Sequence, residues 1–161
     1  MSRLIKKLHR LEDSLLALLL FVLVVLACLQ IFLRNFADTG LSWADPTLRV
    51  LVLWVGLLGA LAASRSNNHI AIDVVSRFLQ GRPLLISHSI TSLFTALVCA
   101  LVAYHALRFV WVEFQEQTIA YAGIPAWIPE SIIPIVFSLI SLRYFLLCVQ
   151  HGSDAIKGNT E

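Results

Sequence analysis

The sequence is built from long apolar runs separated by short polar segments. The first run extends over residues 15–33 and is broken only by Gln30. At a rise of about 1.5 Å per residue, a helix of this length reaches about 28 Å, close to the thickness of the hydrocarbon layer of a bilayer. The run is longer than the about 7–15 apolar residues of a signal peptide, and no small-residue cleavage site follows it. We therefore expect a retained membrane helix over about 14–34.

Three further candidate spans follow, over residues of about 43–64, 84–111 and 129–149. Pro46 and Pro134 fall in the first turns of two of these spans, where the missing N–H costs little. The composition agrees, because 58% of the 161 residues are hydrophobic and only 14% are charged. Soluble domains have about 45–50% apolar and about 25% charged residues. The sequence thus predicts an all-α polytopic membrane protein, a single domain over residues 1–161 with four transmembrane helices.

The segment between the second and third spans has its own pattern. Its apolar residues recur at helical spacing, with polar residues elsewhere on the helical wheel. These apolar residues are Ile70, Val74, Val75, Phe78 and Leu79. We expect a short amphipathic helix over about 70–80, lying at the membrane interface or against a partner.

Lysine and arginine are distributed unevenly among the segments that flank the spans. One side of the membrane would carry Arg3, Lys6, Lys7, Arg10, Arg65, Arg77, Arg82 and Lys157, and the other Arg34, Arg49 and Arg108. Because cytoplasmic segments are enriched in basic residues, both termini are expected in the cytoplasm. The segment with Glu113, Glu116 and Glu130 would then face outward.

No acidic residue falls in the middle of a predicted span. Asp45 lies at the entrance to the second span and Glu130 at the entrance to the fourth. Proton-coupled carriers usually place an ionisable residue inside the membrane, so a free-standing transporter is disfavoured. No internal repeat is visible, and no nucleophile–base pair or glycine-rich phosphate loop is present, so we do not expect an enzyme.

Histidine is the residue type in this chain that could ligate haem or a metal ion. His88 and His105 share one predicted helix and lie about 25 Å apart along it, so they cannot ligate one haem. His69 and Asp73 are four residues apart, but two ligands do not fill a tetrahedral shell. Neither a metal nor a cofactor is expected in this chain.

Gly56 and Gly59 make one side of the second predicted span small. Two interpretations remain open: close packing against another helix, or the ordinary composition of a membrane helix.

Three segments together resemble the small membrane subunit of tripartite ATP-independent periplasmic (TRAP) transporters. The first span ends in QIFLRNF, from Gln30 to Phe36. The second reads WADPTLRVLVLWVGLLGALAASRSNNHIAID, from Trp43 to Asp73, and IPAWIPESIIPIVFSLISLRYFL, from Ile124 to Leu146, is similar to the final span of that family. Many members have an acidic residue where this chain has Pro46, and the adjacent Asp45 is the candidate to substitute for it.

The resemblance implies an accessory subunit of a secondary transporter in the bacterial inner membrane. A periplasmic binding protein would capture an organic acid, and a large membrane subunit would carry the substrate and sodium sites. The small subunit would support that large subunit as a scaffold.

The resemblance and the residue types together suggest a set of partner-contact or structural residues. Arg34 and Arg49 would pair with Asp45 or with carboxylates of a partner, and residues 113–130 would contact the binding protein. The whole set is Gln30, Arg34, Asp45, Arg49, Trp54, Gly56, Gly59, Arg65, His69, Asp73, Glu113, Glu116, Pro125, Glu130 and Pro134.

Two other functions are the alternatives: a free-standing small membrane transporter, and a membrane anchor subunit for haem or quinone. Uptake by this chain alone would favour the first alternative, and a haem absorbance spectrum would favour the second.

Overall fold

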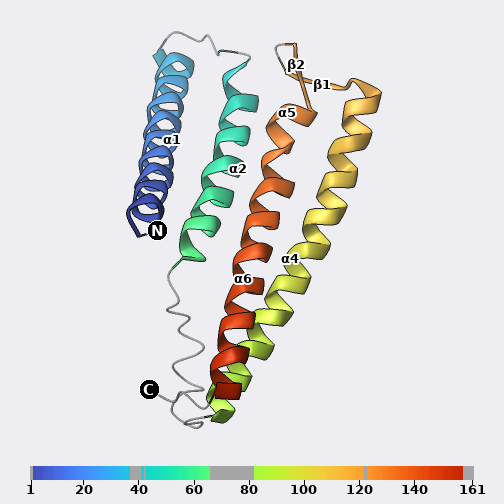
Figure 1. Ribbon diagram of the computed structural model, residues 1–161. Helices are drawn as coiled ribbons and strands as arrows, with labels where there is room; N and C mark the ends of the chain where they lie inside the picture. The colour runs from blue at the N-terminus through green and yellow to red at the C-terminus, as the bar shows by residue number, and fades with distance from the viewer. Residues whose placement is uncertain (1, 37–40, 42, 66–81, 122, 158–161) are drawn as a thin grey trace. The chain divides into compact units, whose positions relative to one another are not determined.

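The computed structural model describes residues 2–36, 41, 43–65, 82–121 and 123–157. Four long helices account for most of them (Figure 1). The elements in chain order are α1 (Ser2–Phe36), α2 (Ala44–Ala63), α4 (Arg82–Glu116), β1 (Ile119–Tyr121), β2 (Ile124–Pro125), α5 (Trp127–Glu130) and α6 (Ile132–Lys157).

Four segments are long and apolar enough to cross a membrane: Arg10–Phe36, Ala44–Ala63, Ile86–Glu116 and Trp127–Ser153. The prediction of four spanning helices is confirmed. The helices α1 and α4 each have 35 residues, or about 52 Å, so they extend beyond a hydrocarbon layer of about 30 Å. The amphipathic helix expected over about 70–80 lies outside the described residues.

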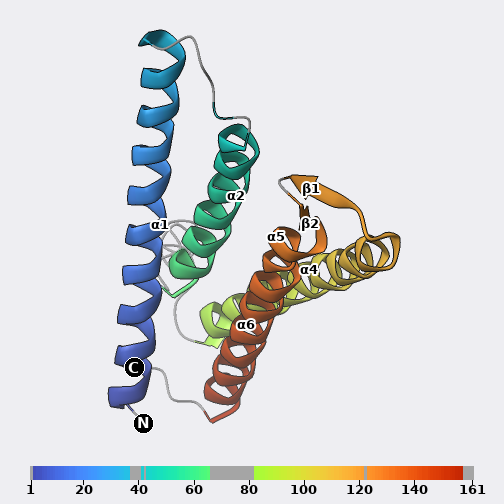
Figure 2. The same ribbon diagram turned by 90° about the horizontal axis from the view of Figure 1, so that it is seen from above.

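The chain divides into two compact units, one of Met1–Ala63 with Phe109–Ile132 and one of Ser64–Arg108 with Ile133–Glu161. In the first unit, α1 and α2 pack side by side, as both ribbon views show (Figures 1 and 2). The helix α2 begins with a tight turn, in which the amide of Ala44 donates to the Leu41 carbonyl over 3.0 Å. Asp45 lies in its first turn, where a carboxylate interacts favourably with the helix dipole.

A small antiparallel ribbon follows α4 in the first unit, and the sequence analysis did not anticipate it. Ile119 pairs with Pro125 and Tyr121 with Ile124, with an irregularity between the two pairs. Gln117 and Gly123 have positive φ angles of 53° and 80°. These two residues let the chain leave α4 and reverse between β1 and β2.

In the second unit, α4 and α6 run antiparallel and are joined by two hydrogen bonds one heptad apart. The Ser89 hydroxyl donates to the Cys148 carbonyl over 3.2 Å, and the Ser141 hydroxyl donates to the Ala96 carbonyl over 2.9 Å. Between and beyond these bonds α4 buries only small residues, which let the helices approach closely. The buried residues of this α4 seam are Ser92, Ala96, Cys99 and Ala103.

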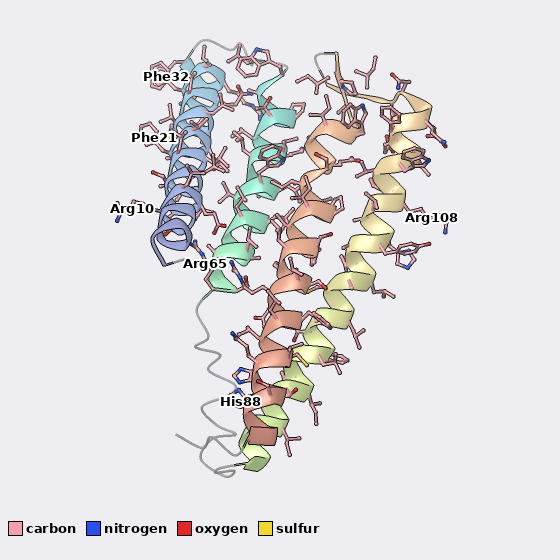
Figure 3. All side chains as sticks on the ribbon, in the orientation of Figure 1. Arg10, Phe21, Phe32, Arg65, His88 and Arg108 are labelled. Carbon is pink, nitrogen blue, oxygen red and sulfur yellow. The ribbon has the colours of Figure 1, made fainter. Side chains whose placement is uncertain are left out.

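Large apolar side chains are mostly exposed on all four long helices. Phe21, Ile31, Phe94 and Tyr104 have between 62% and 69% of their surface accessible. Figure 3 shows such side chains projecting outward along the helices. A water-soluble protein does not expose apolar surface on this scale, whereas lipid or a membrane partner would cover it.

Candidate functional site: the outer face of α2 and its anchoring contacts

The exposed residues of α2 follow one another at helical spacing along a single face. They are Asp45, Arg49, Val52, Leu53, Gly56, Ala60 and Ala63. We call Arg49, Val52, Gly56, Gly59 and Ala60 the outer face of α2. It has one arginine near the beginning of the helix and very small side chains in its second half.

Gly56 and Gly59 lie against open space. A Cβ atom built at either position would meet nothing within 4 Å among the described residues. The small size of these residues is therefore not required by packing within the described chain. Close packing against a partner helix and the ordinary composition of a lipid-facing helix are both compatible with this open space.

Gln30 and Asp45 are brought together by the pairing of α1 with α2. The Gln30 amide donates from Nε2 to Oδ1 of Asp45 over 3.3 Å. The Oε1 atom of Gln30 is buried and accepts no hydrogen bond from the described residues. This side-chain contact joins the last turns of α1 to the first turn of α2.

Arg34 and Arg49 were expected to pair with Asp45 or with a partner. Both arginines are exposed. The contact found at Asp45 is with Gln30, and within the described residues no ion pair joins either arginine to it. Pairing with carboxylates of a partner stays a prediction.

Trp54 anchors α2 to the short helix α5. Its indole Nε1 donates to the carbonyl of Pro129 over 3.0 Å. Trp54 is half-buried and Pro129 is buried. An indole N–H placed in apolar surroundings needs such an acceptor, so this bond fixes how α2 meets the segment before α6.

The segment between α4 and α6 carries the predicted acidic residues in different settings. Glu113 accepts a hydrogen bond from the Thr118 hydroxyl, whereas Glu116, the last residue of α4, is exposed. Glu130 is half-buried, and its Oε2 has no hydrogen-bond partner among the described residues. Pro125 is half-buried in β2.

An aromatic contact joins α4 to α5, and a backbone hydrogen bond closes the ribbon that connects them. The rings of Phe114 and Trp127 meet edge to face with centroids 5.5 Å apart. The amide of Ala126 donates to the Thr118 carbonyl over 2.9 Å. The three glutamates therefore belong to a folded segment, with Glu113 and Glu116 on α4 and Glu130 on α5.

The residues after α2 include a contact that the sequence analysis did not identify. Arg143 of α6 donates from Nη1 to the hydroxyl of Ser64 over 2.7 Å. Arg65 is half-buried beside Ser64, and Pro134 is buried in the first turn of α6. His69 and Asp73 lie outside the described residues.

Nothing in the described part of the chain resembles a reaction centre. No group of three or more histidine, cysteine, aspartate or glutamate side chains that could hold a metal is present among the described residues. The arrangement provides an exposed helix face, a folded segment between α4 and α6, and contacts that hold each of them. These features define a polytopic α-helical membrane protein.

The comparisons with known proteins place this chain more narrowly. A family model described as "Tripartite ATP-independent periplasmic transporters, DctQ component" matches residues 23–151. The chain belongs to this family, as the resemblance of its first, second and last spans indicated. It is a component of a transporter and not an enzyme.

One curated relative is a protein of Haemophilus influenzae named "Putative TRAP transporter small permease protein". The two are 26% identical over 106 residues, which are 66% of this chain and 63% of the relative. The chain therefore spans less than two thirds of the relative that it matches. No solved structure matches the chain significantly.

Proposed function

We propose that the protein is the accessory subunit that supports the large membrane subunit of a TRAP transporter, and that the outer face of α2 is where the two meet. The observation that carries the proposal is the open space at Gly56 and Gly59 on an exposed face. Membrane helices associate through small residues, because these allow backbones to approach closely.

The contrast with the other helices supports this choice of face. The outward residues of α1 and α4 are mostly large, such as Phe21, Phe32 and Phe94, which are 59% to 68% exposed. Large side chains of this kind suit lipid chains, which conform to an irregular surface. The outer face of α2 instead presents a shallow surface that suits another helix.

Arg49 adds charge to the same face. It is exposed on a spanning helix, and a charged group at a membrane boundary is favourable only with a partner or with headgroups. A carboxylate on the large subunit at the same depth in the membrane would pair with the Arg49 guanidinium. This pair would fix the position of α2 along the helix of the large subunit that it contacts.

The acidic residues of the four candidate spans support a subunit that does not itself carry substrate. Each lies within four residues of the end of a span: Glu12, Asp13, Asp45, Glu113, Glu116 and Glu130. Sodium coupling and binding of the organic acid are therefore assigned to the large subunit. The segment of β1, β2 and α5 would face the periplasm and contact the binding protein, with both termini in the cytoplasm.

The test is co-purification of the tagged chain with the large subunit after each of two substitutions, Gly56→Leu and Gly59→Leu. Both substitutions should lower the recovery of the large subunit and the uptake of substrate. The isolated variant chains should still insert into the membrane and should have the same free energy of unfolding as the wild type. Ala100→Leu, at an exposed position of α4, is the matched control and should leave assembly unchanged. Full assembly of both glycine variants would refute this placement of the interface.

Transport itself is tested in vesicles that contain the large subunit with and without this chain. Uptake of labelled organic acids should require the large subunit, the binding protein and a sodium gradient, and this chain should increase it. Uptake by this chain alone would overturn its role as a supporting subunit.

A further inference from the structure

Two histidine rings from different helices meet near one end of the α4–α6 pair. His88 of α4 and His151 of α6 have ring centroids 5.5 Å apart, with an angle of 44° between the ring planes. Both side chains are half-buried. Figure 3 labels His88 where α4 runs beside the last turns of α6. Neither residue is among those that the accessory role uses.

The backbone positions that bring the two rings together are fixed by neighbouring contacts. Ser89, next to His88, donates to the Cys148 carbonyl and lies 3.4 Å from the Cys148 sulfur. A Cβ atom on Gly152, next to His151, would lie 3.6 Å from the Ser89 hydroxyl. The helices are therefore in close contact at this level, and the ring pair is held by a hydrogen bond one residue away on α4.

The ring separation matches that of two imidazoles on one tetrahedral metal ion. With a metal–nitrogen distance of about 2.0–2.1 Å and about 1.2 Å from nitrogen to ring centre, tetrahedral ligands have centroids about 5.3 Å apart. Two rings on opposite sides of a haem iron would be about 6.5 Å apart, with the flat macrocycle between them. The observed 5.5 Å suits the first arrangement and is too short for the second.

The position also allows an ion to reach the rings from water. His88 lies about four residues after the start of the span predicted over about 84–111, and His151 lies about two residues beyond the end of the span predicted over about 129–149. Both residues thus lie at one boundary of the candidate spans. Imidazole is a preferred ligand of Zn²⁺ and of neighbouring transition-metal ions.

From these observations we infer that His88 and His151 form a binding site for one Zn²⁺ ion, with one nitrogen from each ring. No third histidine, cysteine or carboxylate completes a metal site among the described residues, so water fills the remaining positions. A site with two protein ligands binds exchangeably, unlike a structural zinc site, which has four. When occupied, it links the first turns of α4 to the last turns of α6.

The test is isothermal titration of Zn²⁺ into the full chain in detergent, purified with a tag that contains no histidine. The chain has five histidines: His9, His69, His88, His105 and His151. The wild type should bind one equivalent of Zn²⁺. His88→Gln and His151→Gln should each weaken binding at least about tenfold. Loss of a residue that only orients a metal ligand already lowers metal affinity by about this factor, and loss of the ligand itself should cost no less.

The control is the triple variant His9→Gln, His69→Gln and His105→Gln, which keeps only the proposed pair and should bind Zn²⁺ as the wild type does. Cu²⁺ bound to the wild-type chain should show electron–nuclear coupling to two imidazole nitrogens, a readout that needs no substitution. Loss of binding in the triple variant, or unchanged binding in both single variants, would overturn the site. Assembly with the large subunit is not measured in these experiments, so their failure leaves the proposed function standing.

Discussion

Arg143 of α6 donates a hydrogen bond from Nη1 to the Oγ atom of Ser64, 2.7 Å away and 79 residues earlier in the chain. Ser64 follows the last residue of α2 and is buried, with 8% of its surface exposed. The guanidinium lies on a spanning segment, where a charged group needs polar partners. The Ser64 hydroxyl, directly after the end of α2, is one such partner.

Replacement of Arg143 by leucine should lower the free energy of unfolding in detergent. A hydrogen bond to a charged group contributes about 1.5–3 kcal/mol, and Arg143→Leu should lose an amount in that range. Thermal unfolding followed by circular dichroism would measure it. Ser64→Ala keeps the guanidinium but removes this acceptor, so it should also lower the stability. Equal stability of both variants and the wild type would contradict the assigned role.

Trp54→Phe tests the anchor between α2 and α5. Phenylalanine keeps most of the apolar ring but cannot donate to the Pro129 carbonyl, which accepts the indole N–H over 3.0 Å. The expected loss is about 1 kcal/mol, together with faster hydrogen exchange at α5. Trp111→Phe, at a residue with 61% of its surface exposed, is the control and should change neither quantity.

The four spans could be predicted because span length and hydrophobicity are local properties of the sequence. The polar contacts could not, because each joins residues far apart in the chain. Gln30 meets Asp45 across 15 residues and Trp54 meets Pro129 across 75. Only the packing of the helices selects these partners from many possible ones.

The ribbon and the histidine pair were missed for more specific reasons. The ribbon between α4 and α5 depends on positive φ angles at Gln117 and Gly123, and glutamine gives no signal for such a conformation. His151 lies beyond the predicted end of the fourth span, so the span pattern gives no reason to pair it with His88. An antiparallel register for α4 and α6 would have placed His88 and His151 at the same level.

A double-mutant cycle on Gln30 and Asp45 would show which partner Asp45 uses. Gln30→Ala and Asp45→Ala should have a coupling energy of about 0.5–1.5 kcal/mol, the usual contribution of one hydrogen bond. Asp45→Ala with Arg49→Ala should be additive in the isolated chain. A large coupling energy between Asp45 and Arg49 would instead support the ion pair that the sequence suggested between these two residues.

Gly123→Ala tests whether the ribbon needs a left-handed residue at its turn. Gly123 has a φ of 80°, and an added Cβ would meet nothing within 4 Å. The cost is therefore conformational, and about 1–2 kcal/mol of local stability should be lost. Faster hydrogen exchange at Ile119 and Ile124 would reveal it, and Gly56→Ala, which lies in open space within a helix, should not destabilise the isolated chain.

Charge reversal at Glu116 tests whether the segment between α4 and α6 contacts the binding protein. Glu116 is exposed at the end of α4, whereas Glu113 accepts a hydrogen bond from Thr118 and supports the local fold. Glu116→Lys therefore changes the surface charge with little effect on structure. If this segment docks the binding protein, uptake at limiting binding-protein concentration should change, since surface charges act mainly on association rates.

The change should shrink as salt rises, because exposed charges are screened beyond about 8–10 Å at physiological ionic strength. Glu116→Gln removes the charge without reversing it and should have a smaller effect of the same sign. At saturating binding protein both variants should approach the wild-type rate. Uptake that is identical at all concentrations of binding protein and salt would place its contact elsewhere on the transporter.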